Sequence, residues 1–361
     1  MKKYLHLFFF GIILCGCGYK PVFETEGNGS KKYPYSIDLV SISTKPEIKN
    51  LKFIIKKLDE YGVEINLPNN FYNPSKSMYE SYTNSDKNRF MQILNAIKSK
   101  NKIIWSVRGG YGGQSIARRL RDYYIKHPLQ FKNINKTFIG FSDNTLMGMI
   151  LNHYYGINFI HGVVLMFNME LASYSKIQIN YESSITEVLD LFSANNKYIS
   201  YHLMPMNNFA KSMKDKMKGT FIGGNISVIE RNLFGLLKEI NFDNKILFLE
   251  DNEDSPEKMR EMLEGMFDTG RFDKVKAIIF GNIDLKHKNK NNVKQFIRNL
   301  EKYYLSKYLK KPIPIFFASF FGHGKENRPM PMGVDTEIMP YKNDDFILKF
   351  DIRKLGSVAS V

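Results

Sequence analysis

The sequence predicts an α/β protein with an N-terminal domain built on an open parallel sheet and a C-terminal mixed α/β domain with a β-rich end. Three observations lead to this expectation. The chain has 361 residues, which is more than one hydrophobic core usually holds. Strand-like and helix-like segments alternate through the first half, and this alternation is typical of a parallel sheet with helices on both faces. The second half also alternates and ends in a hairpin-like pair of strands.

In the first half, short apolar runs predict strands, and longer segments with apolar residues at helical spacing predict helices. The first helix is expected to end at Gly62, and Ser85 stands where the second helix would take its N-cap. The expected strands are 35–43, 63–68, 102–107, 136–142 and 158–164, and the expected helices are 45–62, 85–100, 114–127 and 144–156.

The second half of the sequence begins with a polar segment, and further predicted strands and helices follow it. Residues 171–215 are polar and tyrosine-rich, and we interpret them as an inter-domain linker between a first domain at 36–170 and a second at 216–355. The expected strands of the second domain are 245–251, 275–283 and 313–320, followed by the hairpin 332–340 and 345–352, with helices at 255–270 and 292–308.

The N-terminus has the pattern of an export signal. Lys2 and Lys3 precede an apolar run that ends at Leu14, which is too short to span a membrane. The segment "LCGC" resembles a bacterial lipobox, in which the last cysteine, here Cys17, is lipidated. We therefore expect residues 1–17 to be a signal segment, 18–35 a tether, and the protein to be exported and lipid-anchored to a bacterial membrane. An uncleaved anchor or a plain signal peptide are the alternatives.

Composition narrows the possible partners and cofactors. The net charge of +16 is spread along the chain, mostly as lysine, and no nucleic-acid-binding motif accompanies it. We interpret it as a solvated surface that attracts anionic ligands at long range. Both cysteines lie within the first 17 residues, so neither a disulfide framework nor a cysteine-based zinc site is expected. No metal or organic cofactor is expected, and no nucleic-acid partner.

The segment "TFIGFSDNTLMG", residues 137–148, places Ser142 between an apolar strand and a helix. In open α/β sheets, functional groups collect at the carboxyl ends of strands. A sharp turn at such an end lifts a serine hydroxyl out of the fold, as in a nucleophile elbow. The N–H groups at the start of the helix, beginning with Asp143, would then face an oxyanion. The alternative is that Ser142 or Asp143 merely caps the helix.

A serine nucleophile needs a base and an acid that orients it. His161 and His323 each follow an apolar strand and precede a glycine, so the residues alone leave both as candidates for the base. The strand "KILFLED" ends in Glu250 and Asp251, and a carboxylate there could face the cleft. The alternative for this segment is an ordinary acidic loop.

The loop "RGGYGG" begins at Arg108 and opens a helix. The backbone N–H groups of Gly110, Tyr111 and Gly112 could approach an anion closely. Ser115 stands where a dinucleotide fingerprint needs its third glycine, so a nucleotide site is not favoured. The Arg108 guanidinium could bind a substrate carboxylate through two hydrogen bonds, or it could pair with an acid such as Asp143 and brace the loop.

Seven blocks together resemble the LD-carboxypeptidases, serine peptidases that include muramoyltetrapeptide carboxypeptidases and microcin C immunity proteins. The resemblance covers roughly residues 36–350, with the blocks in family order. They are "SDKNRFMQILNAI", "RGGYGG", "GFSDNTL", "HGVV", "GTFIGGNIS", "FLED" and "GHGKENRPMPMGV". Departures are "VSIST" where the family has a Pro-Ser stretch, Val163 where it often has proline, and the export signal.

The resemblance implies a Ser142–Glu250–His323 triad, a structural role for His161, and often a homodimer. The implied activity is cleavage of the bond between an L-configured centre and D-alanine at the end of a peptidoglycan tetrapeptide. One alternative is a microcin-immunity-like hydrolase of peptide–nucleotide amides with the same triad. The other is a lipoprotein that binds peptidoglycan without cleaving it, and the presence of all three triad residues in the sequence argues against it.

Overall fold

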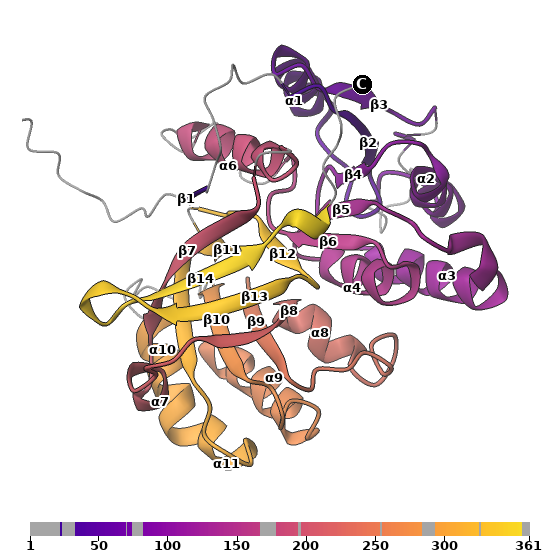
Figure 1. Ribbon diagram of the computed structural model, residues 1–361. Coiled ribbons are helices and arrows are strands. Elements are labelled where there is room, and N and C mark those ends of the chain that lie inside the picture. Colours follow the sequence, from indigo (N-terminus) through magenta and orange to yellow (C-terminus); the bar gives the residue numbers. More distant parts are fainter. Residues whose placement is uncertain are drawn as a thin grey trace, which may run out of the picture.

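The computed structural model describes residues 22–23, 33–69, 71–73, 82–166, 178–193, 196–252, 255–283, 293–324 and 326–355. These residues form two α/β units that lie side by side, with the N-terminal unit at the upper right of Figure 1 and the C-terminal unit at the lower left. The predicted signal segment, with its candidate lipidation site Cys17, lies outside the described residues, as does most of the predicted tether.

The N-terminal unit is a sheet with the strand order β12-β6-β5-β4-β2-β3, in which β6, β5, β4, β2 and β3 are parallel. Every residue of β4 and β5 is buried, as expected for parallel strands covered on both faces. The strands are β2 (Ser36–Val40), β3 (Glu64–Asn66), β4 (Ile103–Ser106), β5 (Thr137–Gly140) and β6 (Asn158–His161). The helices are α1 (Ile48–Glu60), α2 (Asp86–Lys98), α3 (Gly113–Lys126) and α4 (Asn144–Tyr155). The predicted parallel sheet is therefore confirmed.

The edge of this sheet comes from the other half of the chain. Strand β12 (Met330–Met332) lies antiparallel to β6, and Met330 is paired with His161. A three-residue strand that pairs so far back along the chain has no local signal of its own, and the sequence did not predict it. Through β12 the two units share one sheet.

The C-terminal unit is a barrel-like sheet with the order β7-β11-β10-β9-β8-β13-β14, in which β14 pairs back onto β7, and β1 extends β7 on the outside. Strands β8, β9, β10 and β11 are parallel, and the others are antiparallel. The strands are β1 (Val22–Phe23), β7 (Tyr198–Pro205), β8 (Met217–Asn225), β9 (Lys245–Asp251), β10 (Ala277–Ile283), β11 (Ile315–Gly322), β13 (Asp335–Pro340) and β14 (Phe346–Asp351). The helices are α6 (Gln178–Asp190), α7 (Asn208–Lys211), α8 (Ile226–Asn232), α9 (Pro256–Asp268), α10 (Val293–Leu300) and α11 (Ser306–Tyr308). The predicted β-rich end is the β13–β14 hairpin.

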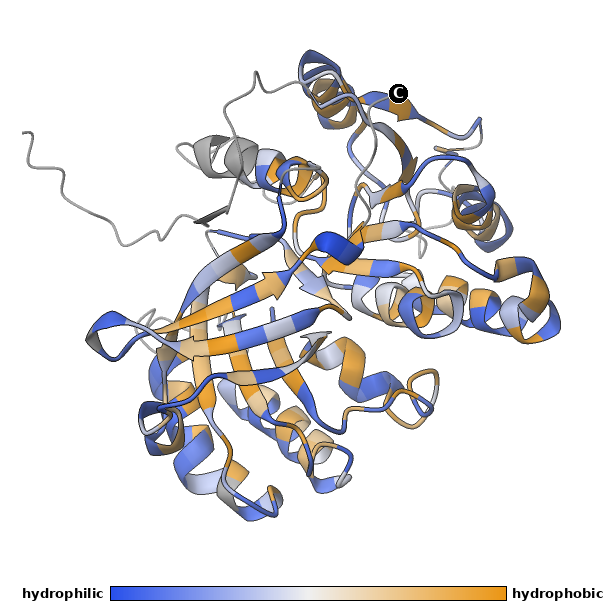
Figure 2. Ribbon diagram, in the orientation of Figure 1, coloured by the Kyte–Doolittle hydropathy of each residue, from blue (hydrophilic) through white to orange (hydrophobic). Residues whose placement is uncertain are grey.

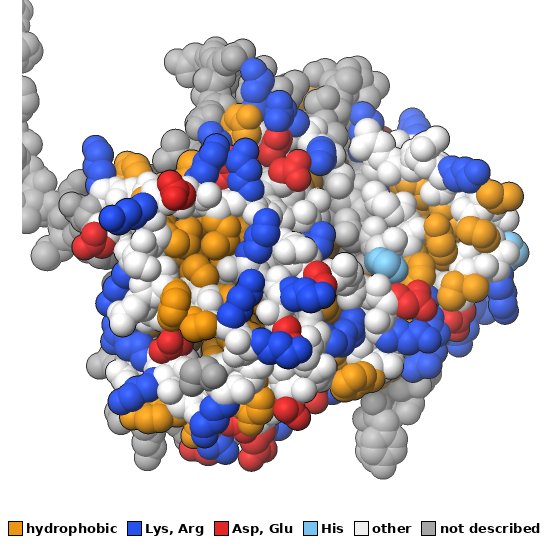
Figure 3. All heavy atoms as spheres, turned by 60° about the horizontal axis from the view of Figure 1, so that its bottom comes forward, with side chains coloured by type: hydrophobic (Ala, Val, Ile, Leu, Met, Phe, Trp, Pro, Cys, Tyr) orange, Lys and Arg blue, Asp and Glu red, His pale blue; other side chains and the backbone are white. Residues whose placement is uncertain are grey.

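The barrel interior is aromatic. Phe248 of β9 is fully buried, with its ring 5.3 Å from that of Phe221 and 4.2 Å from that of Phe321. Figure 2 shows the apolar residues gathered in the strands and on the helix faces turned toward them. On the face seen in Figure 3, lysine and arginine side chains are scattered among acidic and apolar ones. This scatter agrees with the expectation of a solvated lysine surface.

The segment 171–215, which the sequence suggests as a linker, contains α6 and β7. Strand β7 is part of the barrel, because it pairs with both β11 and β14. Its first six side chains alternate between partly exposed and buried, as expected for an antiparallel strand with one covered face.

None of the helices that the structure describes is both long and apolar enough to cross a membrane.

Candidate active site

Ser142 stands at a tight corner between β5 and α4. Its φ angle is 59°, in the left-handed region that few residues other than glycine adopt. The N–H of Asn144 donates to the carbonyl of Phe141 at 3.2 Å, and that of Thr145 donates to the carbonyl of Ser142 at 2.8 Å. Strain of this kind at a strand-to-helix turn is typical of a nucleophile elbow. Asp143 occupies the N-cap position of α4, but its side chain makes no capping hydrogen bond.

The carboxylate of Asp143 instead holds the glycine-rich loop against this corner. Its Oδ2 accepts hydrogen bonds from the Gly113 N–H and the Ser43 hydroxyl, both at 2.7 Å. Burial raises the pKa of Asp143, although these two hydrogen bonds oppose the shift. Gly109 of the loop is so close that an added Cβ would lie 2.7 Å from the Phe141 carbonyl oxygen and 3.1 Å from the Ser142 Cβ. Only glycine allows this approach.

Two further residues fix the loop, and neither was predicted from the sequence. The Tyr111 N–H donates to the Thr44 hydroxyl at 3.0 Å. The side chain of Arg89, which is fully buried, donates to the Gly112 carbonyl at 2.8 Å. The sequence held a signal for Arg89, because this residue lies on the same buried face of α2 as Ile93. A cation on a buried face needs hydrogen-bond acceptors close to it.

Glu250 and His323 meet at the carboxyl ends of β9 and β11. The His323 Nδ1 lies 2.6 Å from the Glu250 Oε2. Glu250 has 0 % of its side chain exposed. Burial alone would raise the pKa of Glu250, but the charge and hydrogen bond of His323, together with His161 close by, outweigh it and lower that pKa to about 2. Glu250 is therefore a carboxylate at neutral pH, able to orient the imidazole of His323 and to stabilise its protonated form.

His161, the second candidate for the base, lies beneath this pair. It is completely buried, and its Nε2 lies 3.3 Å from the Glu250 Oε1. The rings of Phe141 and Phe248 pack against it at 5.1 Å and 5.2 Å. His161 does not line the cavity described next, whereas His323 does. The geometry therefore favours His323 as the base and gives His161 the structural position expected of it.

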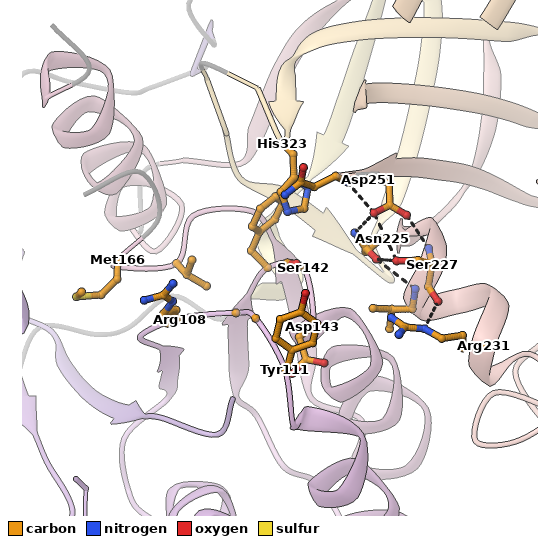
Figure 4. A pocket seen from close by; sticks show the side chains of 16 residues that line it. Arg108, Tyr111, Ser142, Asp143, Met166, Asn225, Ser227, Arg231, Asp251 and His323 are labelled. Carbon is orange, nitrogen blue, oxygen red and sulfur yellow. Dashed lines mark hydrogen bonds between the residues drawn. The ribbon is translucent and has the colours of Figure 1, made fainter. Parts of the chain in front are cut away.

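Ser142 and His323 line the same cavity of about 390 Å³ between the two units. The ring of His323 also packs against Phe141, the neighbour of Ser142, at 4.6 Å. Figure 4 shows His323 above Ser142, with Arg108 and Arg231 on opposite sides. The polar and charged lining residues are Arg108, Tyr111, Ser142, Asp143, Asn225, Ser227, Arg231, Asp251, Asn252 and His323. Of the expected triad and the predicted oxyanion and substrate-binding residues, all except Gly112 and the buried Glu250 therefore lie on this cavity.

One wall of the cavity was not predicted. The Asp251 carboxylate accepts hydrogen bonds from the Asn225 side chain at 3.0 Å and from the Ser227 and Asn252 N–H groups, both at 2.7 Å. Burial raises the pKa of Asp251. Arg231 donates from Nε to the Ser227 carbonyl at 2.8 Å. Asp251 is thus a buried carboxylate that holds Asn225 and Ser227 in place, and not part of an ordinary acidic loop. The sequence signal for these contacts was the "GGNIS" block, which contains both Asn225 and Ser227.

The site is made of groups suited to acid–base and nucleophilic chemistry. In the part of the chain that the structure describes, no cluster of three or more histidine, cysteine, aspartate or glutamate side chains could hold a metal ion. A strained serine, a histidine and a buried carboxylate at one cavity have the components of a serine hydrolase.

Comparisons with known proteins agree with this chemistry. A putative carboxypeptidase of Rickettsia prowazekii is 29% identical over 318 residues, covering 88% of this chain and 91% of that protein. A probable murein peptide carboxypeptidase of Bacillus subtilis is 24% identical over 255 residues, covering 68% and 69%.

Among solved structures, the muramoyltetrapeptide carboxypeptidase of Oxalobacter formigenes has a TM-score of 0.65 at 20% identity, covering 87% of this chain and 98% of that one. The microcin C7 self-immunity protein MccF, in complex with adenosine monophosphate, has a TM-score of 0.66 at 18% identity, covering 88% and 96%. At these identities the two structures show a shared fold.

Family models match both units of the chain. The LD-carboxypeptidase N-terminal domain matches residues 37–162, which include the Ser142 corner. The LD-carboxypeptidase C-terminal domain matches residues 218–338, which include Glu250 and His323. Together the two models cover well over half of the sequence, with the N-terminal model before the C-terminal one. The chain therefore belongs to the LD-carboxypeptidase family of peptidases.

Proposed function

We propose that this protein is a serine carboxypeptidase that removes the terminal D-alanine from peptidoglycan tetrapeptides, by cleaving its bond to an L-configured centre. The observation that carries the proposal is the pairing of His323 with the buried Glu250 on the cavity that also holds the strained Ser142. The names of the murein and muramoyltetrapeptide carboxypeptidases to which the chain is similar support this choice of substrate.

In the proposed mechanism, Nε2 of His323 takes the proton of the Ser142 hydroxyl as the oxygen attacks the carbonyl of the scissile bond. Glu250 holds Nδ1–H of His323 and stabilises the imidazolium that forms. His323 then returns the proton to the amine of the departing D-alanine. Water, deprotonated by His323, then attacks the acyl carbonyl, and His323 gives this proton to the Ser142 oxygen as the acyl–oxygen bond breaks.

The oxyanion would be bound by backbone N–H groups. The N–H groups of Tyr111 and Gly113 are used by Thr44 and Asp143, and Gly112 does not line the cavity, so we assign the two donors to Gly110 and Asp143. One such donor is worth roughly 3 kcal/mol in the transition state. Arg108 lines the cavity beside this loop and would bind the free carboxylate of the terminal D-alanine.

The test is to incubate the purified protein with a muramyl tetrapeptide and to weigh the products. Loss of one alanine, abolished in Ser142→Ala, is the expected result. An intact tetrapeptide would overturn the proposal.

A peptide–nucleotide amide belongs in the same assay as a second candidate substrate. Tyr111 lines the cavity with 71 % of its surface exposed, and an exposed aromatic ring in a cavity wall can stack a nucleobase. Cleavage of the amide alone would favour a microcin-immunity-like hydrolase. Binding of tetrapeptide without cleavage of either substrate would favour a peptidoglycan-binding lipoprotein.

We also propose that the protein is exported and anchored to a membrane through a lipid on Cys17. The support is the signal-like start of the sequence and the register of "LCGC", which puts Gly16 directly before Cys17. Cys17→Ser should lose both the incorporation of a fatty acid analogue and membrane fractionation, whereas Cys15→Ser should keep them. A Cys17→Ser protein that stays fully labelled and membrane-bound would contradict this assignment.

A further inference from the structure

The loop that carries His323 is tied to the rest of the molecule beyond the catalytic contacts. Five residues after His323, the Arg328 guanidinium pairs through Nη1 with the Glu187 carboxylate of α6. Both side chains are about nine-tenths buried, with 9% and 10% exposed. An ion pair this far from solvent holds its partners strongly, because removing either charge leaves the other without compensation.

The backbone on either side of Arg328 is also fixed. The Arg328 N–H donates to the Phe320 carbonyl at 3.0 Å, and the Tyr201 hydroxyl of β7 donates to the Pro329 carbonyl at 2.9 Å. An added Cβ on Gly162 would lie 2.6 Å from the Arg328 carbonyl oxygen. The segment between the end of β11 and the start of β12 is therefore held by contacts from both units, and Arg328 is the charged side chain at its buried end.

We propose that Glu187 and Arg328 are positioning residues for catalysis, which set the place of His323 relative to Ser142. Neither residue lines the cavity, so they act through the loop and not on the substrate. The inference rests on the proposed function, because it assigns His323 as the base. A displacement of the imidazole by about 1 Å is enough to reduce turnover roughly a hundredfold.

The charge of Glu187 depends on its partner. Burial raises the pKa of Glu187 to about 7, even though the charge and hydrogen bond of Arg328 lower it, so the pKa would be higher still without Arg328. Without Arg328 the carboxyl would stay protonated at neutral pH. Loss of either partner therefore removes the same ion pair, and the two substitutions should not add.

The experiment is a double-mutant cycle on the purified full chain with Glu187→Gln, Arg328→Gln and the double variant. Two activities are measured beside the melting temperature. One is the rate at which a fluorophosphonate probe labels Ser142, which needs the triad but no peptide substrate. The other is kcat and KM for the muramyl tetrapeptide. Glu326→Gln is the matched control, since Glu326 also approaches Arg328, with 3.4 Å between its Oε2 and the Arg328 Nε, but is more exposed.

We expect each single variant to lose about tenfold or more in labelling rate and in kcat, with KM within about twofold of the wild type, as displacement of a catalytic group predicts. The double variant should lose no more than the singles. Arg328→Lys, which keeps the charge, should recover most of the lost rate, and Glu326→Gln should label within about twofold of the wild type.

Labelling of Glu187→Gln within about twofold of the wild type, at equal melting temperature, would overturn the positioning role. If Glu187→Gln proves too unstable to purify, Arg328→Gln and Tyr201→Phe decide: the inference fails if both label at the wild-type rate. A wild-type protein that labels at Ser142 but leaves the tetrapeptide intact would refute the proposed substrate alone, and the cycle would still be read from the labelling rates.

Discussion

The two sides of the candidate active site are built in different ways. The nucleophile side is local: Ser142 and Asp143 belong to one turn, and the glycine-rich loop packs onto it through Gly109 and Gly113. The base side is assembled from parts far apart in the sequence, because Glu250 ends β9, His323 follows β11, and Glu187 of α6 holds the loop through Arg328. The first is held by close backbone packing and the second by buried charges.

This difference has an energetic consequence. Backbone packing at the Ser142 corner tolerates no added volume, so it is sensitive to steric change. The buried carboxylates on the other side are sensitive to a change of charge, because an unpaired charge is costly in a buried site. Substitutions can therefore separate the two sides.

The largest effect is expected where the two sides meet. Ser142→Ala and His323→Ala should each lower kcat by several orders of magnitude, roughly 10⁴ to 10⁶, because the members of a triad act as a unit. His161→Ala should cost less activity, since His161 does not line the cavity. Turnover of the tetrapeptide with matched melting curves checks this ranking. A His161→Ala enzyme less active than His323→Ala would transfer the role of base to His161.

The charge on the base side is tested by Glu250→Gln, which keeps the size of the side chain. Turnover should fall by about 10⁴, as it does when an orienting carboxylate is neutralised in a serine triad. Retention of more than about a tenth of wild-type kcat would exclude Glu250 as the orienting acid.

The same variant makes a prediction about pH. The pKa of Glu250 in the folded protein is lowered to about 2, below its ordinary value of 4.5. The carboxylate therefore stabilises the fold above that ordinary value, and this contribution is lost as the pH falls from 4.5 toward about 2. Over this range the free energy of unfolding, measured by denaturant titration, should fall more steeply for the wild type than for Glu250→Gln. Parallel curves would show that the charge of Glu250 does not contribute to stability.

Volume on the nucleophile side is tested by Gly109→Ala. The added Cβ would meet the Phe141 carbonyl oxygen at 2.7 Å, so the loop must move away from Ser142. We expect kcat/KM to fall roughly tenfold to a hundredfold. Gly265→Ala in α9 is the matched control: its Cβ would meet nothing within 4 Å, and it should stabilise the protein by about 0.5 to 1 kcal/mol. Equal activity of the two variants would mean that the close packing at Gly109 does not matter for catalysis.

The smallest effect is expected at Arg108. Arg108→Lys should lower kcat/KM for the tetrapeptide roughly tenfold, since a hydrogen bond to a charged group is worth about 1.5 to 3 kcal/mol. A tetrapeptide whose terminal carboxylate is amidated should be affected far less. Equal losses on both substrates, or a large drop in melting temperature, would assign Arg108 to bracing the loop.

The two sides also differ in how far the sequence predicted them. The strand, corner and helix around Ser142 follow from local apolar patterning, and the structure places each within a few residues of its predicted bounds. The choice between His161 and His323 did not follow from local pattern, because both end a strand beside a glycine. From the sequence, the family resemblance alone favoured His323. The fold adds that His161 is completely buried beside Glu250.

What the sequence missed depends on long-range pairing. Strand β7 was interpreted as part of a linker because its neighbours, β11 and β14, lie more than a hundred residues away in the chain. The hydrogen bonds of Asp251 with Asn225 and Ser227 join the ends of two strands. The spacing of apolar residues within either strand does not predict such contacts. The local sequence does not predict a role for Arg328, because its partner Glu187 lies far away in the chain, on α6.

Strand β12 has a consequence for synthesis. Met330–Met332 cover the edge of β6, which belongs to a sheet otherwise completed by residue 161. During translation the N-terminal half leaves the ribosome first, and until β12 follows, the backbone groups of Asn158–His161 form an open edge beside an apolar core. Such an edge is a template for pairing with other chains. The nascent protein therefore has an aggregation-prone stage that lasts until Met330–Met332 have been synthesised and have paired with β6.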